Sequence, residues 1–167
     1  MILTMKPNDE PKMKGEKKFI PRPGQTDFTD IRWAPVINCV LRYGDEILLM
    51  ERSKDLKLNP GCWSGISGFL DDNKSLEEKV LEEIREEVGI SKEQVISIKP
   101  GKIFDEDDPK YKKTWIVHPV LVEVNTDKVQ TDWEAQNYRW VTLAEAWKMD
   151  YMSGFDKVLK ALFKFDD

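Results

Sequence analysis

Residues 68–90, GFLDDNKSLEEKVLEEIREEVGI, decide the fold because they contain sequence signals for both the start and the end of a helix. Ser75 and Glu78 have the S-x-x-E spacing of a capping box, in which the two side chains accept hydrogen bonds from backbone N–H groups at a helix start. Gly89 stands where a helix commonly ends in the left-handed conformation. The stretch therefore predicts a helix that begins after Ser75 and ends at Val88.

One face of this predicted helix is apolar. Its residues recur at intervals of three and four positions, the spacing of a helix that packs on a core. They are Leu76, Val80, Leu81, Ile84 and Val88. We expect this face to lie on a sheet.

Three glutamates lie beside that apolar face. At roughly 100° per residue, Glu83, Glu86 and Glu87 fall within an arc of about 100°. Like charges at this spacing destabilise an isolated helix by roughly 0.2 to 0.5 kcal/mol per pair. A hard divalent cation, by contrast, accepts carboxylate oxygens as ligands. A solvated acidic face is the alternative; we favour a cation site, with Mg²⁺ as the first candidate and Mn²⁺ as the second.

The stretch resembles the Nudix box, G-x5-E-x7-R-E-U-x-E-E-x-G-U, in which U is a bulky aliphatic residue. Without any gap, the positions that match are Gly68, Glu83, Ile84, Glu86, Glu87, Gly89 and Ile90. Two positions depart from the pattern: Lys74 replaces a glutamate, and Glu82 replaces an arginine.

The resemblance implies an α/β fold, an α/β/α sandwich about a mixed sheet. It also implies hydrolysis of a pyrophosphate bond in a nucleoside diphosphate linked to another group. By resemblance, the metal is held by Glu83, Glu86 and Glu87, and the Gly68 carbonyl is a further ligand. Either Glu83 or Glu86 would act as the base. In this family an acidic residue upstream of an R-W-V strand sometimes completes the site, which makes Glu134 a candidate.

The two departures exchange the signs of two residues that are thought to pair in the family. We therefore expect Lys74 and Glu82 to form an ion pair of reversed polarity. Such a pair contributes roughly 0 to 1 kcal/mol if it is exposed. If the pair is absent, Lys79 is the next candidate for steadying Glu83, since it lies four residues earlier on the same helix face.

The composition bounds the class of protein. The 167 residues suit one domain. Residues 1–18 are charged and rich in proline and lysine, which favours a flexible extension, so we assign residues 19–167 to a single domain. No leader pattern or membrane-length apolar run is present, which predicts a cytoplasmic protein without a membrane partner. Cys39 and Cys62 are too few for a disulfide framework.

The net charge of −5 argues against a partner held by counterion release, such as RNA or DNA. We expect instead a small nucleotide-type substrate. Residues 19–33 contain turn formers and large apolar side chains, and for these we keep three alternatives: simple packing, a homodimer contact and a lid over the substrate.

Other elements can be placed by pattern. Residues 36–41 and 46–50 are apolar runs around the turn at 43–45, which predicts a hairpin. Arg52 follows and is either a surface charge or a contact to substrate phosphates. Trp63, in a loop predicted for 58–68, is either a packing residue or a substrate-stacking platform.

Beyond the helix we predict a strand over 94–104 with an interruption near Pro100, a polar loop over 105–113 and a strand over 114–124. His118 lies within that last strand and is interpreted as a sheet residue. A further strand is expected within 132–141, followed by a short helix capped by Thr142. The apolar spacing over 155–165 predicts a terminal helix.

Two rivals come from other functional classes. The first is a protein of this fold that binds the ligand but is catalytically weak or inactive, motivated by the departures at Lys74 and Glu82. The second is an isopentenyl diphosphate isomerase, which by resemblance needs a histidine-rich metal site; the chain has a single histidine.

Overall fold

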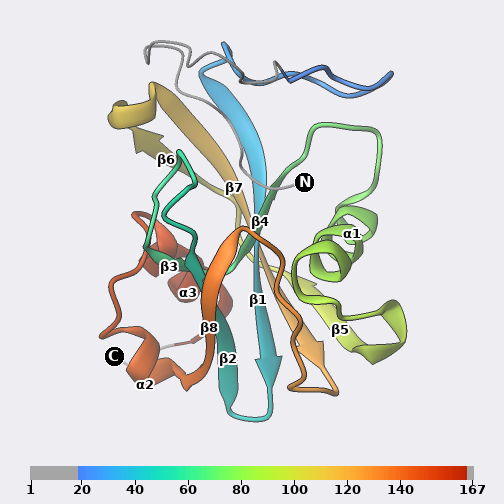
Figure 1. The fold of residues 1–167 in the computed structure, drawn as a ribbon, viewed down its shortest axis with the longest axis vertical. Coiled ribbons are helices and arrows are strands. Elements are labelled where there is room, and N and C mark those ends of the chain that lie inside the picture. Colours follow the sequence, from blue (N-terminus) through green and yellow to red (C-terminus); the bar gives the residue numbers. More distant parts are fainter. Residues whose placement is uncertain (1–18, 165–167) are drawn as a thin grey trace.

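A computed structural model describes residues 19–164, which form one eight-stranded sheet with helices on both faces (Figure 1). The strands are β1 (Trp33–Tyr43), β2 (Glu46–Arg52), β3 (Trp63–Ser64), β4 (Ile66–Phe69), β5 (Val95–Pro100), β6 (Phe104–Asp108), β7 (Lys113–Val124) and β8 (Ala135–Thr142). The helices are α1 (Leu76–Val88), α2 (Leu143–Ala146) and α3 (Phe155–Leu162), with single 3₁₀ turns at η1 (Lys92–Gln94) and η2 (Pro109–Tyr111). Strands β1 and β7 run parallel, whereas the other pairs are antiparallel, so the predicted mixed sheet is confirmed.

Alternation of side chains along the strands produces two cores. On one face, Ile37, Cys39 and Leu41 of β1 pack with the apolar face of α1, and Ile84 at its centre is fully buried. Burying such a side chain contributes about 1.5 to 3 kcal/mol. The other face is covered by α3, on the opposite side of the sheet in Figure 1. The predicted packing of both helices and the core position of Cys39 are confirmed.

The ends of α1 also lie where the sequence predicts them. The Glu78 backbone N–H donates to Ser75 Oγ over 3.2 Å, and the Ser75 N–H donates to Glu78 Oε2 over 2.7 Å. Gly89 has φ of 69° and its N–H donates to the Arg85 carbonyl. Both ends of the helix are thus fixed by local hydrogen bonds, independently of the core.

Two loop predictions are wrong. Phe104–Asp108 form β6, which pairs with β7, whereas a polar loop was expected over 105–113. Asp107 accepts a hydrogen bond from Thr114 Oγ1, and Asp108 accepts one from Trp115 Nε1, so pairing with β7 overrides the low strand preference of the acidic run. The stretch predicted as a loop before α1 contains β3 and β4, and Gly68 lies within β4.

The segment before β1 packs on the domain. The Phe28 ring stacks on Phe69 with 5.9 Å between centroids. The buried Lys113 ammonium donates to the carbonyls of Phe28, Thr29 and Ile31. The packing alternative for this segment is confirmed, whereas the homodimer contact and the lid stay predictions. The predicted extension over 1–18 lies outside the described residues.

The predicted terminal helix is confirmed, although α3 ends at Leu162, earlier than expected. Thr142 caps α2, as predicted. Among residues 19–164, no helix has the length and apolar character needed to cross a membrane.

Candidate functional site

The centre of the candidate site is a contact between α1 and β4. Glu83 is fully buried, and its carboxylate lies against Gly68, which pairs with Ile37 of β1. A Cβ added to Gly68 would come within 2.6 Å of both Cδ and Oε1 of Glu83. Glycine is therefore required at 68 by the space that the Glu83 carboxylate occupies.

A second buried carboxylate lies one turn further along α1, and a third comes from the segment before β8. Glu87 is 7% exposed and Glu134 is 9% exposed. The Asp132 N–H donates to the Glu87 carbonyl over 3.2 Å, which ties this segment to the end of the helix. The Ser53 N–H donates to the Glu134 carbonyl over 2.7 Å. Backbone hydrogen bonds thus hold Glu134 between β2 and α1.

The carboxylates raise one another's proton affinity. Burial raises the pKa of Glu83 to about 7, with a further contribution from Glu86. Burial raises the pKa of Glu134 to about 8, and Asp132 adds to it. Burial, Glu83 and Glu134 together raise the pKa of Glu87 well above its usual value. Like charges have been brought together in a low-dielectric site, which is costly without a cation.

These residues fit a hard divalent cation. Buried Oε1 of Glu87 and Oε2 of Glu134 have no hydrogen-bond partner within residues 19–164, and buried polar atoms ordinarily have one. Carboxylate oxygens are the donors that Mg²⁺ and Mn²⁺ accept. Within the described range, no three acidic, histidine or cysteine side chains already converge on one coordination point, so the set is close but not assembled into a shell.

The structure places the other predicted site residues at different depths. Glu86 lies at the solvent side of α1, where it raises the pKa of Glu83. Arg52 is buried, which excludes the surface-charge interpretation, and its Nε and one Nη donate to the Leu58 carbonyl over 3.0 and 2.8 Å. Burial lowers the pKa of Arg52, whereas the charges of Glu87 and Glu134 raise it, so the guanidinium lies within range of their electrostatic field.

Trp63 does not lie among those carboxylates. It is half-buried in β3 against the core on the α3 side, and its backbone exchanges hydrogen bonds with Asp150 and Met152. His118 is a half-buried residue of β7. The two side chains occupy sheet positions, as packing residues do.

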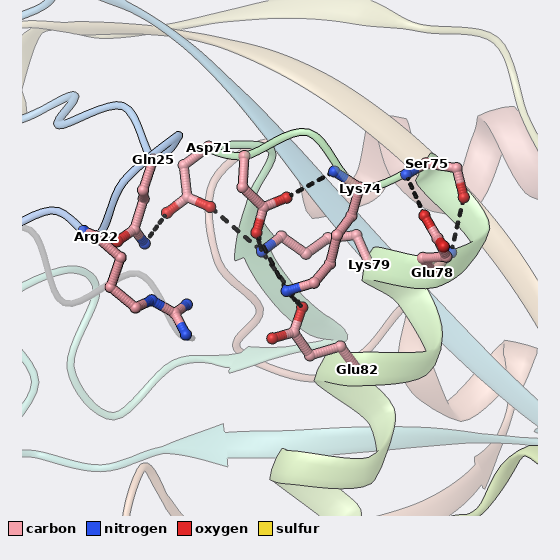
Figure 2. Close-up of polar contacts among 9 residues, drawn as sticks. Arg22, Gln25, Asp71, Lys74, Ser75, Glu78, Lys79 and Glu82 are labelled. Atoms are coloured by element: carbon pink, nitrogen blue, oxygen red, sulfur yellow. Dashed lines mark hydrogen bonds and ion pairs between the residues drawn. The ribbon is translucent and has the colours of Figure 1, made fainter.

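The ion pair expected from the exchanged signs is confirmed. Lys74 Nζ lies 2.9 Å from Glu82 Oε2 (Figure 2). Lys79 is present in the same cluster and contacts Asp71, Asp72 and Glu82. The expected pair is therefore present, whereas the ion pairs shown for Lys79 go to these three acids and not to Glu83, which Lys79 was expected to steady.

Sequence reasoning missed two features. The first is Asp132, whose charge raises the pKa of Glu87 and Glu134, so it lies near both carboxylates. Its position two residues before Glu134 in the sequence could have marked it as a further acidic residue of the site. The burial of Lys79 was also missed, because a lysine beside an apolar stripe usually keeps its ammonium in water.

The chain is similar in sequence to a known protein family and to a known protein. It matches the family model of the NUDIX domain over residues 32–163. A Pseudomonas aeruginosa NAD-capped RNA hydrolase, NudC, is 36% identical over 59 residues, 35% of this chain and 20% of the relative. The match thus spans only a fifth of that relative's length.

Solved structures are similar in fold. The NUDIX domain of Shewanella oneidensis NrtR, in complex with ADP ribose, superposes with a TM-score of 0.65 at 17% identity, covering 78% of this chain and 86% of that one. A C. elegans Ap4A hydrolase superposes with a TM-score of 0.59 at 22% identity, covering 79% and 95%.

Proposed function

The chain belongs to the NUDIX domain family, and on this premise we propose that it is a pyrophosphohydrolase, which cleaves, with a divalent cation, a pyrophosphate bond in a nucleoside diphosphate linked to another group. The observation that carries the proposal is the set of three buried carboxylates that act on one another, those of Glu83, Glu87 and Glu134, the first of which lies against Gly68. Such a set has little structural purpose without a cation, because three buried carboxylates destabilise the fold.

In this proposal Glu83, Glu86, Glu87 and Glu134 hold the cation, together with the Gly68 carbonyl. The bound ion, Mg²⁺ or Mn²⁺, would neutralise phosphate oxygens and lower the pKa of an attacking water. Glu83 or Glu86 would accept the proton of that water.

The substrate side of the proposal involves Arg52 and Trp63. The Arg52 guanidinium lies in the field of Glu87 and Glu134, where a phosphate would need a positive partner. Its hydrogen bonds to the Leu58 carbonyl fix its orientation. Trp63 is retained as a stacking candidate only through its half-exposed ring.

The proposed ligand is a small nucleotide rather than a nucleic acid, consistent with the net charge of −5. A cytoplasmic location and a homodimer belong to the same proposal. Both can be checked with the purified full chain and with a tagged chain in cells.

The test is a panel assay. The full chain is incubated with ADP-ribose, diadenosine tetraphosphate, NAD⁺ and deoxynucleoside triphosphates, with Mg²⁺, with Mn²⁺ or with a chelator. Products are separated by anion-exchange chromatography. We expect at least one compound to be cleaved at its pyrophosphate bond only when the cation is present. Cleavage of none of them with either cation would refute the hydrolase proposal.

The alternative, a catalytically weak or inactive binding protein, was motivated by the departures at Lys74 and Glu82. Those positions keep an ion pair at 2.9 Å, which removes much of that motive. The same panel distinguishes the two, because a binder would raise the melting temperature with a ligand that it never cleaves.

A further inference from the structure

Four charged side chains at the start of α1 form a closed ring of alternating sign. Lys74 Nζ lies 3.3 Å from Asp72 Oδ2 and 2.9 Å from Glu82 Oε2. Lys79 Nζ lies 3.0 Å from the same oxygen of Asp72 and 3.5 Å from the same oxygen of Glu82. Figure 2 shows the Lys74 ammonium beside the Glu82 carboxylate and the Lys79 ammonium joined to Asp71. Each carboxylate oxygen therefore serves both lysines.

The two lysines differ in burial. The Lys79 side chain is 1% exposed, and that of Lys74 is 40% exposed. Burial would lower the pKa of Lys79, but its contacts with Asp72 and Asp71 raise it above the usual value. Lys79 therefore stays charged inside the protein, where a charge is tolerated only with close partners.

The buried ammonium also reaches beyond the ring. Lys79 Nζ lies 3.2 Å from Asp71 Oδ1, and the other oxygen of Asp71 accepts a hydrogen bond from Gln25 Nε2 over 2.8 Å. Gln25 Oε1 in turn accepts from the Arg22 backbone N–H. Lys79 thus joins α1, the loop after β4 and the segment before β1 (Figure 2).

Its place along the chain connects this cluster with the candidate site. Lys79 lies one helical turn before Glu83, and Asp71 follows Gly68 by three residues. The loop and the helix turn that Lys79 joins are therefore the two elements whose contact brings Glu83 against Gly68.

We propose that Lys79 is a positioning residue for the cation site: it clamps the 71–72 loop to α1 and so holds Glu83 against Gly68, an inference that rests on the proposed function. Lys79 touches neither substrate nor reacting atoms. Lys74, at the exposed corner of the ring, also bridges Asp72 to Glu82, but its 40% exposure makes that bridge the weaker of the two.

The test compares two identical chemical changes in the full chain. Lys79→Met removes the clamp, and Lys74→Met is the matched control. Amide hydrogen exchange over 68–73 is measured without added cation, and Mn²⁺ binding is measured by calorimetry. We expect Lys79→Met to speed exchange at least tenfold and to weaken Mn²⁺ binding at least tenfold. We expect Lys74→Met to change each less than threefold, and Lys79→Arg to recover part of the loss.

If Lys79→Met does not fold, Asp71→Asn, which removes one partner of the ammonium, is expected to produce the same two changes at smaller size. Equal effects of the two lysine substitutions, or unaltered exchange and Mn²⁺ binding in Lys79→Met or in its Asp71→Asn substitute, would overturn the positioning role. Cleavage of no panel compound with either cation would refute the proposed function, and the clamp would then be judged by hydrogen exchange alone.

Discussion

The Glu83 carboxylate lies so close to Gly68 that a methyl group at 68 would come within 2.6 Å of it. This contact couples a strand residue to a helix residue across the candidate site. Any side chain at 68 must therefore displace the carboxylate or separate β4 from α1.

Gly68→Ala is predicted to weaken Mn²⁺ binding at least tenfold and to lower the free energy of unfolding by about 1 to 3 kcal/mol, because the added methyl overpacks a buried contact. Calorimetry and chemical denaturation measure the two effects. Gly44→Asn is the control, since nothing lies within 4 Å of a Cβ there and asparagine tolerates its φ of +59°. If Gly68→Ala binds Mn²⁺ as tightly as the wild type does, the contact between Gly68 and Glu83 has no role in the cation site.

Glu87→Gln is predicted to lower the rate of any cleavage in the panel by about two orders of magnitude or more, since it removes a ligand charge. The fold should survive, because burial and the neighbouring acids already disfavour the charge of Glu87. Rates are measured at saturating Mg²⁺, and circular dichroism reports the fold. Glu77→Gln, an exposed glutamate of the same helix, is the control. An unchanged rate in Glu87→Gln would refute the assignment of Glu87 as a ligand of the cation.

Without a cation, the stability of the protein should fall as pH rises from 5 to 8. The folded pKa of Glu134, about 8, lies above its ordinary value of 4.5, so the folded state binds the extra proton and loses this advantage as pH rises. Glu134→Gln should make the slope shallower. Denaturation in the presence of chelator measures it, and a slope that is equal in both proteins would refute the prediction.

Asp72 should have the opposite dependence. Hydrogen bonds and charge interaction with Lys79 outweigh burial and lower its pKa from 3.8 to about 2. Its carboxylate therefore stabilises the fold above pH 4, and this contribution is lost as pH falls toward 2. The difference in unfolding free energy between wild type and Asp72→Asn should shrink over that range. A difference that stays constant over this range would contradict the prediction.

Reversing the charges at positions 74 and 82, so that they match the glutamate and the arginine of the family pattern, should destabilise the protein. In Lys74→Glu with Glu82→Arg, the arginine would face Lys79 and the new glutamate would face Asp72. Like charges about 4 Å apart repel by roughly 4 kcal/mol near a protein surface. Because Lys74 is 40% exposed, we expect a loss of about 1 to 3 kcal/mol. Adding Lys79→Met should reduce the free energy of unfolding that the double variant loses. Chemical denaturation of the wild type, Lys79→Met, the double variant and the triple variant measures this. An equal loss with and without Lys79→Met would contradict the ring.

The sequence predicts α1 well because its signals are local. The cap at Ser75, the apolar repeat and Gly89 each act within one or two turns, and all three agree. Glu134 could be proposed only by resemblance, and backbone hydrogen bonds from Asp132 and Ser53 hold its segment between α1 and β2.

What sequence reasoning missed depends on distant partners. The acids of β6 are poor strand formers, and their pairing with β7 cannot be read from their own pattern. The burial of Arg52 depends on the Leu58 carbonyl. The pair of Lys74 and Glu82 could be predicted because their charges are exchanged relative to the family pattern. The closed ring could not, because it depends on the loop conformation that brings Asp72 to both lysines.

The Lys113 ammonium, which is held by carbonyls of Phe28, Thr29 and Ile31, has a consequence for where the folding unit starts. The family match begins at residue 32, after all of those acceptors. A chain trimmed to that match would leave a buried ammonium without its carbonyl acceptors. The packed part of the protein therefore extends upstream of the region that the family match covers, at least to Phe28.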